Sequence, residues 1–341
     1  MRLPAITKRT RNTLWIVGAI LLLLIAALYL RTIAPPEAAR LLPESDGILY
    51  ADLRPLRIAT HFDEKPVQRD PAFQQFMDAT GIVFERDLDE VAISLHRMAD
   101  PHGPNGPVAY SQVYVGKLDA RKLSAWLATE AANTESYAGH TIYSIPSEGR
   151  TVRVAILGYD TVALTNTPTP EQIHSILDRY RSAAMPFSGS SLLAEHYRDI
   201  PQLPLPPLAW GIGKIGLPLS EGGNGSEQAH GGAIHVFGIE LPIHADSTFV
   251  SYLRWTGSLN LHIEEQSGSP AEAAVTVGAL NNLLALAQGV TNASLDSKAT
   301  QQLKTLLDAT KVELHHDHAE VTTVLPDEMV KEMLLPTNRQ H

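Results

Sequence analysis

The feature that most constrains this chain is an apolar run near its N-terminus, Leu14 to Leu30, which contains no charged residue. A helix rises about 1.5 Å per residue, so crossing a hydrocarbon layer of about 30 Å takes roughly 17 to 25 residues. Trp15 and Tyr29 lie near the ends of the run, at the depth that amphipathic rings favour. The pattern therefore predicts one transmembrane helix over residues 13–31.

Basic residues stand on one side of this run. Arg2, Lys8, Arg9 and Arg11 precede it, and no acidic residue occurs before Glu37. Positive charge next to a span is typical of the cytoplasmic side. We therefore predict a single-pass protein of the inner (cytoplasmic) membrane. Residues 1–12 form a cytoplasmic tail, and the rest of the chain is periplasmic or otherwise extracytoplasmic.

A cleaved signal peptide is the alternative interpretation of the same run. The apolar core of a signal peptide usually has about 7 to 15 residues, which is shorter than this run. Small residues at Ala34, Ala38 and Ala39 would suit cleavage, but Pro35 and Pro36 crowd that position. We favour an uncleaved signal anchor.

Composition limits what the part beyond the span can be. The chain has 341 residues, 44% of them hydrophobic, which is enough for a folded core, and it has no cysteine, so no disulfide can form. Five of the 27 basic residues lie at or before Arg31, which leaves 22 against all 37 acidic residues. Such an acidic surface repels phosphate backbones, so nucleic acid is an unlikely partner.

The rest of the chain reads as alternating short strands and capped helices. We predict an α+β fold with mainly antiparallel sheets and helices packed on one face. Its divisions are a spacer at 32–40, an α+β domain at 41–216, a glycine-rich loop at 217–232, and a second α+β domain or half at 233–336. Residues 108–180 and 259–334 share an order of strand, helix, strands and helix, which suggests a structural duplication.

Helix starts are the clearest local signals. Asp70-Pro71 and Asp119 are expected N-termini, because Asp caps free amides and Pro suits the first helical turn. Thr169-Pro170 with Gln172 predicts a capping box, and Ser269-Pro270 repeats the pattern. The last two predicted elements are a hairpin with its turn at residues 316–318 and a helix at 327–334.

Several of these segments resemble an uncharacterised bacterial family of single-pass, signal-anchored exported α+β proteins. The resemblance is carried by the anchor, by the segment from Leu42 to Leu53, and by Gly81 followed by residues 87–91. The strand with Trp210 and the closing hairpin and helix at 312–334 are similar as well. The resemblance implies the location and the fold, and it implies no activity or site residues.

The densest group of potential metal ligands is His315, His316 and His318 beside Asp317. On a regular strand, His316 and His318 would face one side. A structural zinc site normally needs four converging ligands. The others would have to come from more distant histidines, namely His235, His244 and His262. His315, His316 and His318 are the candidate metal site, and an exposed polar turn is the favoured alternative.

A second motif is the GxGxxG string at residues 211–216. It binds a dinucleotide only where it joins a strand to a helix N-terminus. Pro218 and a glycine-rich stretch follow here, so we predict a tightly packed strand and no cofactor.

A third candidate is the acidic run Glu85, Asp87, Asp89 and Glu90. Paired carboxylates can perform acid–base chemistry or hold calcium. The run lacks the glycine and the later Glu of a calcium loop, so a solvated entrance to a strand is favoured. No GxSxG, HExxH or P-loop motif occurs, and catalytic residues stay unassigned.

These observations predict a membrane-tethered extracytoplasmic binding or scaffolding protein. Its expected partners are the membrane, envelope proteins, or a small ligand bound between the two halves. An envelope enzyme of hydrolase type, with an Asp/Glu/His site outside the known motifs, is the alternative. Metal handling through the histidines is a third interpretation.

Overall fold

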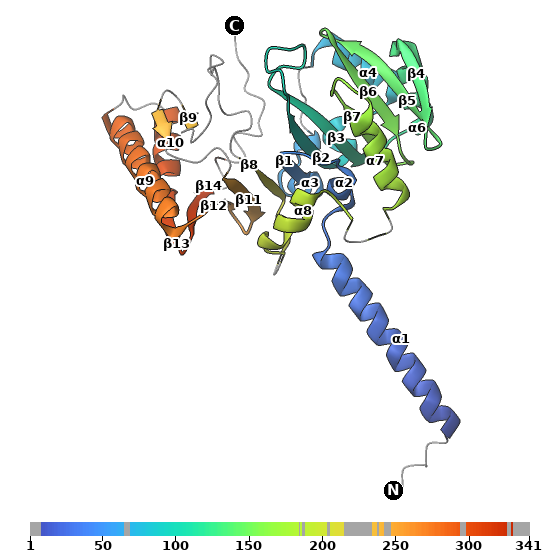
Figure 1. Ribbon diagram of the computed structural model, residues 1–341, viewed down its shortest axis with the longest axis horizontal. Helices are drawn as coiled ribbons and strands as arrows, with labels where there is room; N and C mark the ends of the chain where they lie inside the picture. Colours follow the sequence, from blue (N-terminus) through green and yellow to red (C-terminus); the bar gives the residue numbers. More distant parts are fainter. Residues whose placement is uncertain are drawn as a thin grey trace.

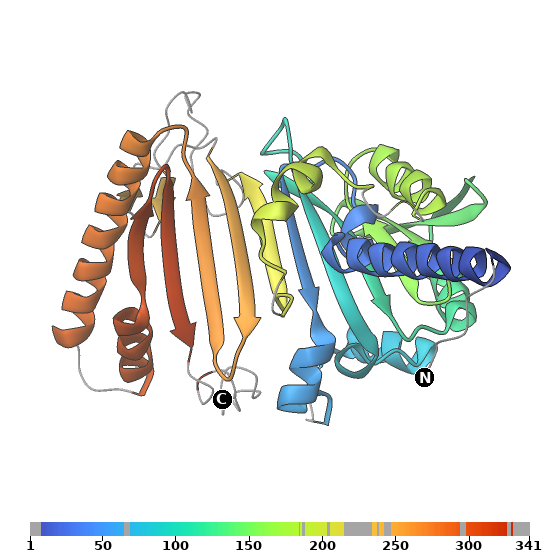
Figure 2. The same ribbon diagram turned by 90° about the horizontal axis from the view of Figure 1, so that it is seen from below.

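The computed structural model describes residues 8–64, 69–183, 185, 188–202, 205–214, 234–236, 239–241, 247–293, 298–325 and 329. The predicted glycine-rich loop at 217–232 lies outside these residues, and so does nearly all of the predicted helix at 327–334. The chain beyond the first helix is built on one long antiparallel sheet (Figures 1 and 2).

The sheet has twelve strands in the order β13-β14-β12-β11-β8-β1-β2-β3-β7-β6-β5-β4. Their bounds are β1 Gly47–Asp52, β2 Leu88–Arg97, β3 Val108–Gly116, β4 Asn133–Tyr137, β5 His140–Ser147, β6 Arg150–Ile156, β7 Thr161–Thr165, β8 Ala209–Lys214, β11 Thr248–Trp255, β12 Leu259–Gln266, β13 Lys311–His315 and β14 His318–Leu325. β9 Ile234–Val236 and β10 Ile239–Leu241 pair separately. The pairings between the described strands are all antiparallel, as the sequence predicts.

Ten α-helices and two short 3-10 turns complete the described chain. They are α1 Lys8–Ile33, α2 Glu37–Leu41, α3 Leu53–Thr60, α4 Pro71–Thr80, α5 Phe84–Asp87, α6 Ala120–Glu130, α7 Glu171–Arg181, α8 Ser191–His196, α9 Pro270–Ala293 and α10 Lys298–Ala309, with η1 Phe62–Glu64 and η2 Tyr197–Asp199. The α+β class with antiparallel strands is thus confirmed.

The sheet is organised around its central pair, β1 and β8, which run antiparallel. On one side, β1, β2 and β3 lie in order, α6 crosses to the outer edge, and β4 to β7 return so that β7 pairs with β3. On the other side, β8, β11 and β12 lie in order, α9 and α10 follow, and β13 and β14 return so that β14 pairs with β12. The two halves therefore have similar topologies, with four returning strands in one half and two in the other, which agrees with the suggested duplication and extends it to β1 and β8.

The half from β1 to β7, here called the N half, is covered on both faces. Neighbouring strand residues point to opposite faces. Ala155 and Ala163 belong to the cluster with α2, α7 and α8, whereas Val154 and Val162 belong to the cluster with Leu123 of α6. Two separate hydrophobic cores thus lie above and below the same strands.

In the half from β8 to β14, here called the C half, the long helices α9 and α10 pack on one face, and among the described residues only α8 packs on the other face, at β8. Thr310, just after α10, bonds to the hydroxyl of Thr323 on β14 (3.0 Å), and Asn281 of α9 reaches the carbonyl of Val312 (3.5 Å). The opposite face of β12 and β14 carries His262, Glu264 and Glu320. No helix crosses the outer strands of this face in Figure 2.

Close approach of β1 and β8 explains the glycines of the GxGxxG string. A Cβ at Gly213 would lie 2.9 Å from the Cα of Gly47, and one at Gly211 would lie 2.8 Å from a methyl of Leu49. Gly211 and Gly213 therefore permit tight strand packing. The predicted strand is confirmed as far as Lys214.

Helix α1 projects away from the sheet (Figure 1). Its apolar side chains are exposed along its length, for example Trp15 at 72% and Leu22 at 68%. The apolar stretch described within α1, Trp15–Leu30, is a short one. In α9 the stretch Pro270–Asn292, with mean hydropathy 1.4, is long and apolar enough to cross a membrane by length and composition. α9, however, packs beside α10, β13 and β14.

Some local predictions are corrected. α7 starts at Glu171, and its N-cap residue Pro170 makes no side-chain cap bond, so the predicted box at Thr169 does not form. Ser269 does cap α9 by accepting from the amide of Glu272 (3.3 Å). Strand β4 was not expected, because its exposed polar side chains show no alternation that a core would impose.

Candidate functional site

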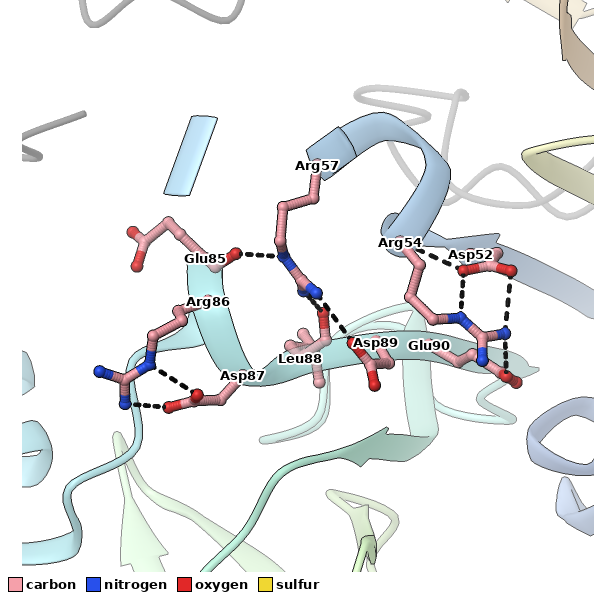
Figure 3. Close-up of polar contacts among 9 residues, drawn as sticks. All are labelled: Asp52, Arg54, Arg57, Glu85, Arg86, Asp87, Leu88, Asp89 and Glu90. Atoms are coloured by element: carbon pink, nitrogen blue, oxygen red, sulfur yellow. Dashed lines mark hydrogen bonds and ion pairs between the residues drawn. The ribbon is translucent and has the colours of Figure 1, made fainter. Parts of the chain in front are cut away.

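The acidic run, which spans α5 and the first residues of β2, is neutralised by arginines (Figure 3). Each of its four carboxylates has its own partner: Arg69 with Glu85 (2.6 Å), Arg86 with Asp87 (2.7 Å), Arg57 with Asp89 (2.9 Å) and Arg54 with Glu90 (2.7 Å). Carboxylates held in this way are poor calcium ligands, because each charge is already compensated. The expectation of a merely solvated strand entrance is corrected, since the run is bound to other parts of the chain.

Helix α3 supplies two of those arginines. It begins because Asp52, at the end of β1, accepts from the amide of Arg54 (3.0 Å). One turn later, Arg57 donates to the carbonyls of Glu85 (2.8 Å) and Leu88. The helix is thereby fastened across the start of β2, and Arg54 is placed between Asp52 and Glu90.

Glu90 is the carboxylate of this run that reaches an aromatic environment. Burial raises its pKa, and the neighbouring Arg54 and the hydroxyl of Tyr50 act in the opposite direction. Burial also raises the pKa of Tyr50, which remains a neutral hydroxyl. The Tyr50 hydroxyl donates to Glu90, and both residues lie at the wall of a cavity.

That cavity lies at the end of α1 and holds about 660 Å³. Its wall runs from the chain that leaves α1, Ala34 to Glu37, to the strands β1 and β8 at the centre of the sheet. A second cavity of about 550 Å³ adjoins it, because both are lined by Pro35, Tyr197 and Gln202. We call the two together the foot cleft, with the first as the polar cavity and the second as the apolar cavity.

Aromatic rings form the floor of the polar cavity. Tyr50 and Trp210 are opposite each other on β1 and β8 and stack with centroids 5.4 Å apart, and Tyr197 meets Trp210 edge-on at 5.4 Å. The row continues across β11 and β12, where Tyr252 pairs with Trp210 and stacks on His262 at 4.5 Å. Four strands therefore present rings on one face.

A larger hollow, about 890 Å³, lies on the other side of Arg54. It is more open than the foot cleft, and charged side chains of both signs line it. Several of them pair with each other, such as Arg86 with Asp87 and Lys122 with Asp119. Because Tyr159 is the one aromatic residue among those that line this hollow, whereas stacked rings line the foot cleft, we regard the foot cleft as the better ligand site.

The predicted metal ligands are only partly brought together. His315 and His318 pair across the closing hairpin, whereas His316 occupies the turn with φ 53°. The two-residue turn therefore places His315 with His318 on one face, rather than His316 with His318. His262 joins them through Glu320, which lies 3.1 Å from His262 and 3.0 Å from His315.

These imidazoles lie within contact distance of carboxylates. His318 also contacts Glu264 (3.2 Å). Among the described residues, no group of three or more His, Asp or Glu side chains is placed to hold a metal ion. His244 lies outside those residues, and His235 is described only as part of β9. Metal binding by His315, His316 and His318 therefore stays a prediction.

A serine–histidine contact occurs inside the N half. The Nε2 of His96 lies 2.9 Å from the hydroxyl of Ser111 and 3.2 Å from that of Ser94. Both serines are fully buried, and burial lowers the pKa of His96. No substrate can reach a buried hydroxyl of this kind, so the contact is part of the core and does not favour the hydrolase alternative.

Sequence reasoning missed the foot cleft. Tyr50 and Trp210 are 160 positions apart, and only the pairing of β1 with β8 brings them together. A signal was nevertheless present, because Tyr50, Trp210 and Tyr252 each lie in a segment that the sequence predicts to be a strand. The arginine partners of the acidic run carried no comparable signal.

No protein-family model and no curated protein matches this sequence. Solved structures of TP0453 are distantly similar. Crystal form III has a TM-score of 0.47 and 11% identity, covering 88% of this chain and 99% of that chain. Crystal form I has a TM-score of 0.43 and 11% identity, covering 89% and 99%. Identity this low assigns no family, and the resemblance predicted from the sequence stays a prediction.

Proposed function

We propose that this chain is a membrane-tethered extracytoplasmic binding protein that holds a ligand in the foot cleft. α1 would be the tether and the sheet the binding domain. The observation that carries the proposal is the position of the cleft, where two adjoining cavities meet the end of α1 and the central strands of both halves.

The exposed apolar surface of α1 supports the tether. Side chains such as Leu22 and Leu23 would be in water if α1 were not in a membrane, at a cost of about 25 cal/mol per Å² of apolar surface. Basic residues before the apolar stretch favour the orientation with the N-terminus in the cytoplasm.

The lining of the cleft supports binding. Ligand sites are concave, largely apolar and supplied with a few polar groups that orient the ligand. Here Tyr50, Tyr197 and Trp210 supply apolar surface, while Glu90 and Gln202 supply polar groups. β1 and β8 belong to different halves, so the ligand would lie where the halves join.

The absence of cysteine permits a clean test of the orientation. One variant has a single cysteine in place of Glu130, which is exposed at the end of α6, and the other has one in place of Thr10, before the apolar stretch. Cells that express either variant are treated with a membrane-impermeant maleimide after their outer envelope has been permeabilised. We expect labelling of E130C but not of T10C. The reverse pattern would overturn the proposed location.

Binding is tested with the full chain extracted in polymer-bounded native membrane discs. Q202W would fill the space shared by both cavities, whereas E195W adds the same ring to an exposed position of α8 that lines neither cavity. We expect native mass spectrometry to show a small molecule retained by the unchanged protein and by E195W, and lost from Q202W. Equal retention by both variants, or no bound molecule, would contradict the proposal.

A further inference from the structure

The apolar cavity of the foot cleft opens beside the last residues of α1. Ile33, the C-terminal residue of α1, lines it together with Leu193 and Ala194 of α8 and with Ile200. In a tethered chain this end of α1 lies at the membrane surface. A hydrocarbon chain leaving the outer leaflet would therefore meet an apolar wall at once, without crossing water.

The polar cavity continues from that wall and differs in chemistry. Four carboxylates line it, Glu37, Asp52, Glu90 and Asp160, against two arginines, Arg40 and Arg54. Arg54 pairs with Asp52 and Glu90, and Arg40 donates to the carbonyls of Pro35 and Ala183. The four carboxylates therefore exceed the two arginines by two negative charges. A ligand group here meets this net negative charge and aromatic faces, which favours a cationic group over an anionic one.

From these two linings we propose that the ligand is a single-chain amphiphile whose head group carries an ammonium and no net negative charge. Its hydrocarbon chain lies in the apolar cavity, and its head lies in the polar cavity near Glu90 and the rings of Tyr50 and Trp210. The inference rests on the proposed function and adds the class of ligand.

The two cavities are the right size for the two parts of such a molecule. A ligand pocket usually has about 300 to 1,000 Å³, and each cavity falls within that range at about 660 and 550 Å³. Pro35, Tyr197 and Gln202 stand at the junction and touch both parts. A purely polar ligand would leave the apolar cavity empty, and a purely apolar one would leave Glu90 without a ligand group.

The test uses the full chain in lipid nanodiscs with photoactivatable lysophospholipids that share one acyl chain. Lysophosphatidylethanolamine carries an ammonium and no net charge, and lysophosphatidylglycerol is anionic. Crosslinking yield at residues 188–202 is divided by the yield at α1, which corrects for the concentration of each probe in the bilayer. We expect about tenfold more crosslinking with the ethanolamine probe, corresponding to about 1.4 kcal/mol.

Two variants test where the hydrocarbon chain of the ligand lies. A194W fills the apolar cavity at an exposed position of α8, and E195W is the matched control on the same helix. A194W should lose most of the crosslinking at 188–202, and E195W should keep it. E90Q removes one of the four carboxylates and should reduce the preference for the ethanolamine head.

The outcomes separate this inference from the proposed function. Equal crosslinking by both probes would overturn the head-group assignment. Glycerophosphoethanolamine lacks the acyl chain, and if it bound as well as the ethanolamine lysolipid, the proposal that the ligand is an amphiphile would be overturned. If neither lysolipid reacts while Q202W still loses a retained small molecule, the inference fails and the proposed function stands. If no molecule is retained at all, both fail.

Discussion

The two halves of the sheet have similar topologies but are stabilised differently. In the N half, helices on both faces enclose two hydrophobic clusters. In the C half, the described residues from 247 onward contribute only Val250, Leu259, Ala273 and Ala319 to the buried hydrophobic set. A similar succession of strands thus supports a doubly covered half and a half in which, among the described residues, no helix covers the polar face of the outer strands β12, β13 and β14.

The difference teaches where each part of the molecule can interact. Strands covered on both sides must bury their side chains, so the N half serves as the rigid base for α3 and for the floor of the foot cleft. The uncovered face of the C half keeps its imidazoles and carboxylates partly exposed. The foot cleft therefore lies where the two kinds of half meet, at β1 and β8.

The largest expected effect compares buried isoleucines. Ile142 on β5 is fully buried, so I142A should lower the free energy of unfolding by about 3 kcal/mol through lost contacts and a cavity. Ile263 on β12 is only half-buried, and I263A should cost about 1 kcal/mol. Urea unfolding of both variants measures the difference. Equal losses would mean that the C half is as tightly packed as the N half.

The next effect concerns the attachment of α3 to β2. R57A should lower the free energy of unfolding by about 2 kcal/mol, because it leaves Asp89 and the carbonyls of Glu85 and Leu88 without their donor. R198A is the control, since Arg198 is 82% exposed and contacts only Asp199. If both variants unfold at the same urea concentration as the unchanged chain, the arginine contacts are not stabilising.

Acidification should lower the stability of the folded protein through His96, the buried histidine of the N half. The pKa of His96 lies below the ordinary 6.5 because of burial, so between the two values the unfolded chain binds a proton that the folded chain resists. Stability conferred by neutral His96 is therefore fully present above pH 6.5 and falls as the pH decreases through its folded pKa. H96N should flatten this part of the pH profile, measured by urea unfolding. An unchanged slope would assign the pH dependence to other groups.

The smallest effect is expected in the C half. H262Q removes contacts to Glu264 and Glu320 on the uncovered face, where pairs of this kind contribute about 0 to 1 kcal/mol. Thermal unfolding should therefore show little change. A loss as large as that of R57A would show that the His–Glu pairs hold β12, β14 and β13 together.

Local structure was largely predictable. Asp70 and Asp119 cap α4 and α6, and Gly81 ends α4 with a φ of 75°, because capping and left-handed turns depend on a few neighbouring residues. The hairpin of β13 and β14 was also expected. The predicted single layer of helices describes the C half, whereas coverage of both faces in the N half depends on how α2 and α7 pack back onto distant strands.

The candidate site was less predictable. Every carboxylate of the acidic run was visible in the sequence, but the partners Arg54 and Arg57 lie more than 30 positions away from theirs. Their ion pairs depend on the packing of α3, which no local pattern predicts. The reverse holds for the histidines: the sequence showed a dense cluster, and a two-residue turn separated His316 from the others.

By itself, the sequence determined an apolar N-terminal helix, an acidic chain without thiols, and strands and helices whose ends follow local capping and turn chemistry. Tertiary structure alone decided that β1 meets β8, that four rings form a row across the sheet, and that two cavities join at the end of α1. The physical reason is the range of the interactions. Caps, turns and hydropathy act over a few residues, whereas strand pairing and cavities arise between segments that the chain separates by many positions.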